Sequence, residues 1–355
     1  MLVPPRHPVQ PLTRRTALRG AVSGLGAGLA VLGLGGCDVR WVSGAETTPT
    51  AQRGSDDDAR DAAVADTRDL LGLLLPAARA AEPLGSVATL AVQACEAHLR
   101  ALGEEQFGVT SSGGTAAVDA AAVLDRLAVT TGSALTAASR TDRAPSAGMA
   151  RLLAAVGASR AVLLDDVSAA TGVAAPAVAL PAAAPAPASP TPTPSEPEDR
   201  AGTAALQAAL AGEHAAVFGF ALVEGRLPDP RRAEAAADLA AHRVARDDLV
   251  DVLVSRGGDP AQAAVGYDAA VPTAEAATAL AATMTERLSG AYADVVATSA
   301  PDRTLAVSAL VRNARTARRW GSTVTSFPGM AELAEDGTSV PRATSSATAT
   351  ATSTP

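Results

Sequence analysis

The chain has little of several residue types on which common functions depend. Its 355 residues include two cysteines and four histidines, aromatic residues make up 2%, and all 29 basic residues are arginine, so lysine is absent. So few aromatic side chains offer little stacking surface for bases or sugars. Two cysteines cannot supply the several bridges of a disulfide-stabilised scaffold, which excludes that class of small secreted domain.

The chain is acidic as a whole, with a net charge of -8. Four arginines lie within the first 19 residues, which contain no acid, so the remaining chain carries 25 arginines against 37 acidic residues. Binding to a phosphate backbone requires a basic face. We therefore expect no nucleic-acid partner.

The first 37 residues have the three parts of a bacterial export signal. Arg14 and Arg15 precede a glycine-rich apolar run from Gly20 to Gly36, and small residues lead into Cys37. The run has 17 residues, which is shorter than the ~20 strongly apolar residues of a spanning helix. The pattern resembles a twin-arginine export signal joined to a lipobox. This resemblance implies cleavage before Cys37 and attachment of lipid to its thiol.

Two alternatives stay open for this leader. Ala17 stands where twin-arginine signals usually have phenylalanine, so the general secretory route is one alternative, and an uncleaved anchor helix is the other. The favoured interpretation is an exported protein. Membrane lipid on Cys37 would hold it at the outer face of the cytoplasmic membrane.

Composition divides the chain into two larger blocks and four flanking or connecting segments. The predicted segments are a signal peptide (1–36), a lipidated tether (37–57), an N-terminal helical bundle (58–172), a Pro/Ala-rich linker (173–200), a C-terminal four-helix domain (201–330) and a disordered tail (331–355). The alternating prolines from Pro190 to Pro194 cannot form a helix or a sheet, so the linker is predicted to act as an extended spacer.

The two larger blocks predict an all-α fold of two up-down helical bundles. Apolar residues recur at helical spacing in both blocks, and each block has over 100 residues, enough for its own core. The predicted helices span 59–82, 86–102, 115–140 and 146–170 in the first block and 203–224, 230–256, 273–299 and 301–320 in the second. Because Asp125-Arg126-Leu127 matches Glu286-Arg287-Leu288, the blocks are predicted to be diverged copies.

One apolar helix of the first block carries a cysteine, a carboxylate and an imidazole. With Cys37 lipidated, Cys95 has no cysteine to pair with, and we expect it to be buried as a small apolar residue. Glu96 and His98 are two residues apart and project to different sides of the helix. They are predicted to lie at the surface or at an interface.

Helical phase in the second block directs polar side chains into the core. Glu213 falls close to the centre of the apolar stripe of its helix, and His242 and Arg246 complete the stripe of the next. Charges placed there must be paired, so these three residues are predicted to form a core polar cluster. His214 lies on the flank, and Glu286 faces away.

Four motifs of this block resemble a known family. They are Glu213-His214-Ala215, His242-Arg243-x-x-Arg246-Asp247, Glu286-Arg287-Leu288 with Tyr292, and Trp320 followed by Phe327-Pro328-Gly329. Together they resemble a ferritin-like domain of unknown function found in exported proteins of high-GC Gram-positive bacteria. The resemblance covers residues 201–330 and implies a ferritin-like four-helix bundle without an established activity.

Three roles are open for the core polar cluster. A structural role without a cofactor is favoured, because di-iron bundles use Glu-x-x-His motifs and this block contains none. A pocket for a small ligand is a second role. The third is a single metal ion, or a redox site, held by Glu213, His214 and His242. The predicted protein is a membrane-anchored ferritin-like lipoprotein with a structural or ligand-binding role and no assigned catalytic residue; the alternative is a metal-binding redox protein.

Overall fold

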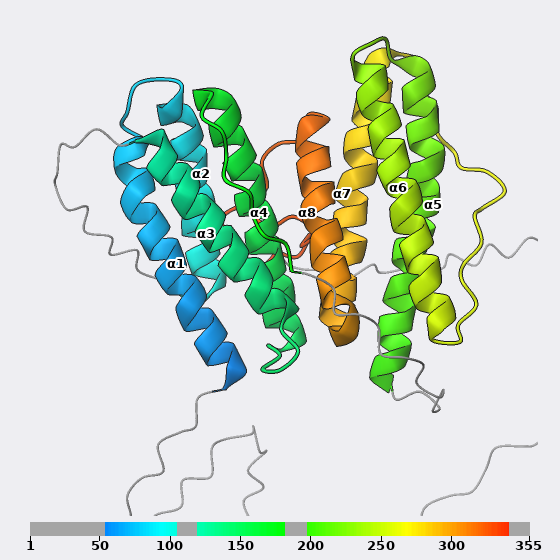
Figure 1. Ribbon diagram of the computed structural model, residues 1–355, viewed down its shortest axis with the longest axis horizontal. Helices are drawn as coiled ribbons and strands as arrows, with labels where there is room; N and C mark the ends of the chain where they lie inside the picture. The colour runs from blue at the N-terminus through cyan, green and yellow to red at the C-terminus, as the bar shows by residue number, and fades with distance from the viewer. Residues whose placement is uncertain (1–53, 105–118, 182–196, 341–355) are drawn as a thin grey trace, which may run out of the picture. The chain divides into compact units, whose positions relative to one another are not determined.

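A computed structural model describes residues 54–104, 119–181 and 197–340 (Figure 1). Within these ranges the protein is all-α, as predicted, with eight α-helices, one 3-10 helix and one isolated β-bridge. The leader with Arg14, Arg15 and Cys37 lies outside the described residues. Export and lipidation therefore stay predictions.

The first block forms four helices with clear local end signals. They are α1 (Ser55–Ala77), α2 (Leu84–Ala101), α3 (Ala120–Ser139) and α4 (Ala147–Thr171). The Asp119 side chain caps α3 by accepting from the Ala121 amide, and Ser146 caps α4 by accepting from Met149. Gly172 ends α4 at φ +70°, a left-handed conformation that glycine adopts without strain.

The second block forms four further α-helices. They are α5 (Pro197–Arg226), α6 (Arg231–Ser255), α7 (Ala274–Thr298) and α8 (Arg303–Arg319), with the 3-10 helix η1 (Ala300–Asp302) before α8. Across both blocks the predicted helix ends lie within about six residues of the observed ones. The largest difference is at α5, which begins at Pro197, where proline fits a first helical turn.

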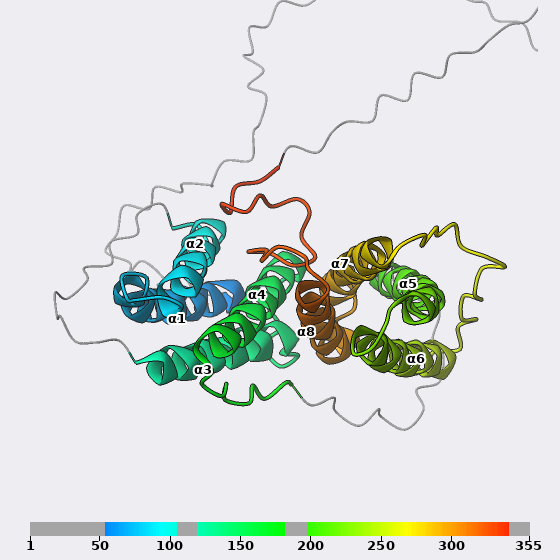
Figure 2. The ribbon, with the colours of Figure 1, turned by 90° about the horizontal axis from the view of Figure 1, so that it is seen from above.

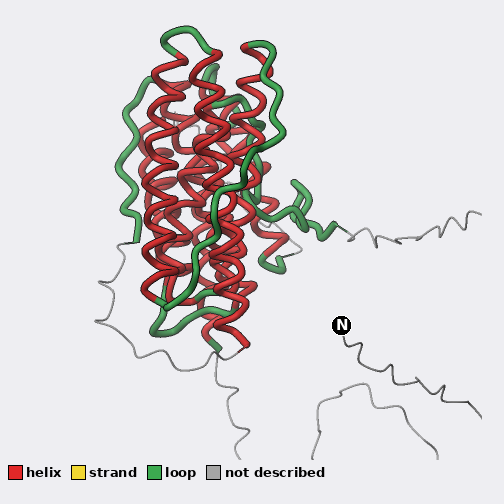
Figure 3. Tube along the Cα trace, turned by 90° about the vertical axis from the view of Figure 1, so that its right-hand side faces the viewer, coloured by secondary structure: helices red, strands yellow, loops and turns green. Residues whose placement is uncertain are grey.

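The same order of helix pairing occurs in both blocks. In the first, α1 packs on α2 and α3, and α3 on α4; in the second, α5 packs on α6 and α7, and α7 on α8. The helices run along a common direction (Figure 3). Within each block the buried apolar side chains lie between these helices.

The two blocks meet at α4, which packs against α7 and α8 (Figure 2). Arg315 and Arg318 of α8 pair with Asp165 and Asp166 of α4 at 2.9 Å and 3.0 Å. This contact is not predicted from the sequence, whose composition indicates two bundles connected only by a linker.

The chain after α8, residues 321–340, is called the C-terminal segment below, and it crosses back to the first block. Its Ser326 carbonyl is 2.9 Å from His98 Nε2, and its Asp336 carbonyl accepts from Arg100. An antiparallel bridge joins Leu333 and Ser339. The predicted start of the disordered tail at 331 is therefore corrected, because residues 331–340 are held by contacts with α2. Residues 341–355 lie outside the described part.

Two described helices are long and apolar enough to cross a membrane by composition alone, namely α4 and residues Arg200–Arg226 of α5. In the 18-residue apolar stretch of α4, 78% is buried inside the protein, and in the corresponding stretch of α5 the buried share is 44%. Packing within the bundles accounts for the apolar character of α4. This feature is weak evidence for a membrane span.

Candidate functional site

The second block buries a polar cluster to which each of its four helices contributes one side chain. Glu213 of α5 is 0% exposed. Its Oε2 atom is 2.7 Å from Nδ1 of His242 on α6, and its Oε1 atom accepts from the Tyr292 hydroxyl of α7 at 2.6 Å. Arg312 of α8 completes the set with Nη2 at 3.3 Å from Oε1. A single carboxylate thus ties four helices together.

The protonation of this cluster follows from its donors and acceptors. The carboxylate of Glu213 accepts from His242, so Nδ1 carries the imidazole proton and Nε2 is the other ring nitrogen. Burial, followed by the charge of Glu213, raises the pKa of Tyr292 well above its ordinary value, so the phenol stays protonated and donates. Phe220 stacks on the His242 ring with centroids 5.0 Å apart. These contacts fix the imidazole in one orientation.

Two of the three predicted cluster residues meet, and the third does not. Glu213 and His242 are in contact, but the prediction for Arg246 is wrong: its guanidinium pairs with the neighbouring Asp247 at 2.7 Å, at the protein surface. The buried stripe of α6 continues from His242 to Ala245, not to Arg246. Arg312 supplies the guanidinium instead.

The three residues of the predicted metal site do not converge. His214 is half-buried, and its Nε2 lies 3.0 Å from the carbonyl oxygen of Ala261, in the loop after α6. Within the described ranges, no group of three or more His, Cys, Asp or Glu side chains is placed to hold a metal ion. Glu286 is exposed, as its helical phase predicts.

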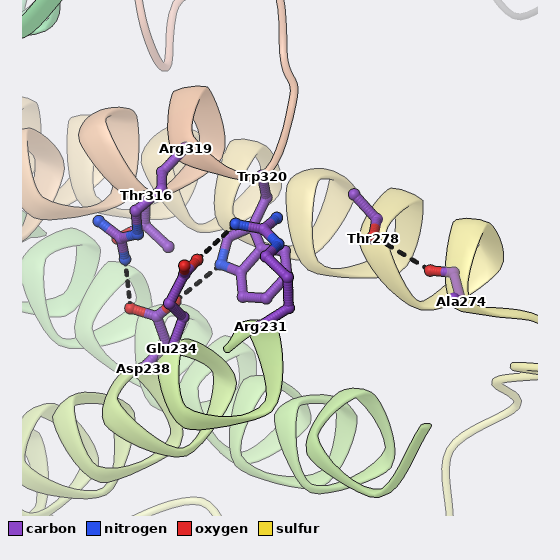
Figure 4. Close-up of polar contacts among 8 residues, drawn as sticks. All are labelled: Arg231, Glu234, Asp238, Ala274, Thr278, Thr316, Arg319 and Trp320. Atoms are coloured by element: carbon purple, nitrogen blue, oxygen red, sulfur yellow. Dashed lines mark hydrogen bonds and ion pairs between the residues drawn. The ribbon is translucent and has the colours of Figure 1, made fainter. Parts of the chain in front are cut away.

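A second buried carboxylate, Asp238 of α6, lies near the end of α8 (Figure 4). One oxygen accepts from Arg319 and the other from the indole Nε1 of Trp320 at 2.7 Å. Arg231 is paired with Glu234, and its Cζ atom lies over the Trp320 ring, 3.9 Å from the ring centroid. Sequence reasoning missed Asp238, although its spacing of four residues from His242 places both on one helix face.

A pocket of about 260 Å³ lies over both clusters. We call it the arginine pocket, because three arginines of α8 line it. The lining includes Arg312, Arg315, Arg319, Asp238 and His242, together with Ser308, Thr316 and Leu180. The arginines were not predicted as a site. Their spacing of three and four residues puts them on one face of α8. This spacing is the sequence pattern from which a cluster of arginines could have been predicted.

Each guanidinium of the arginine pocket has one carboxylate partner and retains a free donor. Arg312 pairs with Glu213, Arg315 with Asp165 and Arg319 with Asp238. In the part of the chain that the structure describes, the three Nη1 groups have no hydrogen-bond acceptor. The Nε2 atom of His242 also lacks a partner there. The walls can therefore bind an oxygen-rich anion. When the pocket is empty, each guanidinium is still paired with a carboxylate.

The buried polar residues of the first block have a different character. Arg160 of α4 donates to the Thr130 carbonyl at 3.2 Å and to Thr67 Oγ1 at 2.6 Å. Cys95 is a free buried thiol, as predicted. Its pKa is raised to about 11 by burial, against the opposing effect of Arg160, so it stays protonated and is a poor nucleophile.

Comparison with known proteins identifies the second block. Residues 205–332 match the model of a family described as "Domain of unknown function (DUF4439)". The chain is similar to a solved structure, a conserved hypothetical protein, rv2844, from Mycobacterium tuberculosis; the identity is 37%, the match covers 35% of this chain and 89% of that chain, and the TM-score is 0.34. No curated protein matches the chain. The family match agrees with the predicted domain of unknown function in the second block.

Proposed function

We propose that this protein is a membrane-anchored binding protein whose arginine pocket takes a small oxyanion, a carboxylate or a phosphate. The observation that carries the proposal is one pocket lined by Arg312, Arg315, Arg319 and His242. The Nη1 groups of the three arginines have no acceptor among the described residues. Guanidinium groups bind carboxylate and phosphate through paired N–H donors, which gives both affinity and orientation.

In this proposal, Glu213 positions the ligand-binding groups. It holds the His242 ring through Nδ1 and approaches Arg312 through its other oxygen. A neutral imidazole with its proton on Nδ1 offers Nε2 as an acceptor. A ligand that carries a hydroxyl, such as hydrogen phosphate, can donate to this atom. No catalytic role is assigned to any of these residues.

Binding of inorganic phosphate and of acetate, measured by titration calorimetry at low salt, tests the proposal. Arg315→Gln removes a pocket donor, so we expect affinity to fall by about tenfold or more, since a charge-assisted hydrogen bond contributes about 1.5–3 kcal/mol. Arg318→Gln is the matched control: it breaks the neighbouring α4–α8 ion pair, but Arg318 does not line this pocket.

Three outcomes would contradict the anion proposal. They are the absence of binding in the unaltered protein, equal losses in both arginine variants, and stoichiometric iron, manganese or zinc in protein purified without chelators that is lost in Glu213→Gln. The last outcome would support the metal-binding redox alternative.

The membrane anchor is the second part of the proposal and is supported by the leader alone. Export directed by Arg14 and Arg15, cleavage before Cys37 and lipid on its thiol would hold the protein at the outer face of the cytoplasmic membrane. We expect Cys37→Ala to move the protein from the membrane to the soluble fraction. Retention of this variant on the membrane would contradict lipidation.

A further inference from the structure

A larger pocket, of about 490 Å³, lies between α7, α8 and the C-terminal segment. We call it the C-terminal pocket. Its apolar walls include Val162, Ala314, Ala317, Phe327, Met330 and Leu333. The volume lies within the range of ~300–1,000 Å³ typical of small-molecule sites. Two motifs noted in the sequence, Glu286-Arg287 and Phe327-Pro328-Gly329, meet here although about 40 residues separate them.

The outer wall of the C-terminal pocket is fixed by contacts with both blocks. Gly329 has φ +82°, and a Cβ atom there would lie 2.5 Å from the Ser289 carbonyl oxygen of α7. Arg151 of α4 donates to the Gly329 carbonyl at 3.2 Å and pairs with Glu332 at 2.6 Å. The contact of Ser326 with His98 adds a tie to α2. The pocket is therefore formed before any ligand binds.

Three polar side chains around the C-terminal pocket already have partners: Ser289, Arg318 and Glu335. The Nε group of Arg318 binds Asp166, and its Nη1 group binds the Ser322 carbonyl. Glu335 accepts from the Ser326 amide at 2.6 Å.

Five polar side chains that line this pocket have no hydrogen bond or ion pair to another described residue: Glu286, Arg287, Ser322, Thr323 and Thr325. The hydroxyl of Ser322 is buried in the wall without a hydrogen-bond partner. Arg287 and Glu286 are exposed at the rim, and neither has an ion pair or hydrogen bond to another described residue.

We propose that the C-terminal pocket binds a long-chain carboxylate, a single-chain amphiphile with one negative charge. The chain lies on the apolar walls, and the carboxylate pairs with Arg287 at the rim. A small polar ion would leave the apolar walls in contact with water, and an uncharged apolar molecule would leave Arg287 unused. Glu286, at the same rim, opposes a second negative charge on the head group. This site is independent of the arginine pocket and goes beyond the proposed function.

Gly290 of α7 provides a way to fill this pocket. It lines the pocket, and a Cβ atom added to it would meet no atom within 4 Å, so Gly290→Leu places a side chain in the empty space. The matched control is Gly132→Leu in α3. Gly132 is also half-buried and helical, and a Cβ atom added to it would meet no atom within 4 Å, but it lies outside the pocket.

Fluorescence titration with 11-(dansylamino)undecanoic acid, followed by displacement with palmitate or hexadecanol, tests the proposal on the purified protein. We expect saturable binding in the unaltered protein and in Gly132→Leu, and at least tenfold weaker binding in Gly290→Leu. Arg287→Gln should weaken palmitate binding by about tenfold and leave hexadecanol unchanged.

Absence of saturable binding in the unaltered protein would overturn this proposal, as would unchanged binding in Gly290→Leu. If Gly290→Leu does not fold, Arg287→Gln decides alone, because its exposed side chain can be replaced without disturbing the core. Equal loss of palmitate and hexadecanol in that variant would also contradict the proposal. Arg315→Gln should bind as the unaltered protein does, which separates this site from the arginine pocket.

Discussion

Glu213 brings a carboxylate into the centre of the second block, where it is fully buried and has three partners on three other helices. Its contribution to stability comes from this pairing. Removing one member of a buried charged set leaves the others desolvated without a partner, which costs more than the set itself contributes.

We expect Glu213→Gln to lower the free energy of unfolding by about 3 kcal/mol, because an amide cannot accept from His242, Tyr292 and Arg312 as a carboxylate does. Urea unfolding followed by circular dichroism measures this loss. The control is Glu234→Gln, whose partly exposed pair with Arg231 should be worth less than about 1 kcal/mol. Equal losses in the two variants would show that Glu213 does not hold the cluster together.

His98 of α2 is buried at the contact with the C-terminal segment, which is the interface alternative of the prediction made from its sequence position. Burial, and then the charge of Arg160, lower its pKa to about 3. The native imidazole is therefore neutral over most of the acid range. The unfolded chain takes up this proton below about pH 6.5.

Between about pH 6.5 and pH 3 the unfolded state binds more protons than the native state at His98, so stability falls as the pH drops through this window. The expected loss from this residue is about 2 kcal/mol at pH 5, from 1.5 pH units at ~1.4 kcal/mol each. Urea unfolding at pH 7 and pH 5 measures it, and His98→Gln should remove this part of the pH dependence. His214→Gln, at a half-buried position, should keep it. An unchanged slope in His98→Gln would contradict the assignment.

Sequence reasoning at the residue scale succeeded where helical phase alone decides burial. It placed Glu213 and His242 in the core, because each lies on the apolar stripe of its own helix. It failed for Arg246, because Arg246 follows the buried Ala245 directly, and one residue turns a side chain by ~100° around the helix. Tyr292 and Arg312 were not predicted as partners of Glu213, because their contact depends on how α7 and α8 pack against α5.

At the scale of elements, the helices were predictable because their signals are local. Apolar spacing, side-chain caps such as Asp119 and Ser146, and the glycine after α4 all lie within the segments they define. Residues 331–340 were not predictable in this way. Their order comes from distant contacts: Gly337 lies against the Ala97 carbonyl, and Arg100 donates to the Asp336 carbonyl.

The C-terminal segment depends on Gly329, where a left-handed φ and a close approach to α7 coincide. We expect Gly329→Ala to cost about 1–2 kcal/mol for the backbone conformation, and about 1–3 kcal/mol more because the Ser289 carbonyl must move. Gly321→Ala is the control, since Gly321 has φ +102° but nothing within 4 Å of an added Cβ. Thermal and urea unfolding of both variants measure the difference, and equal losses would mean that the segment does not press on α7.

At the scale of the whole molecule, the contact of α4 with α7 and α8 makes the two blocks mutually dependent. The blocks share an order of helix pairing but not a polar centre: the first has Arg160 between hydroxyl and carbonyl oxygens, and the second has Glu213 among donors. This contact was not predictable from composition, which identifies a linker but not what the connected parts touch.

Because the interface includes ion pairs from Asp165 and Asp166 as well as apolar packing, we expect both blocks to unfold in one cooperative transition. Differential scanning calorimetry should give equal calorimetric and van't Hoff enthalpies. Two resolved transitions would show that the blocks are independent bundles, as the sequence alone suggested.

The proposed function depends above all on the binding of a small oxyanion beside His242 in the arginine pocket. The most direct test is a phosphate titration of histidine-15N-labelled protein at fixed pH and ionic strength, observed by NMR and assigned with His242→Gln. We predict a saturable shift of the His242 Nε2 resonance, unchanged His98 and His214 resonances, and a weaker response in Arg315→Gln. A His242 resonance that does not move at saturating phosphate would contradict the proposed function.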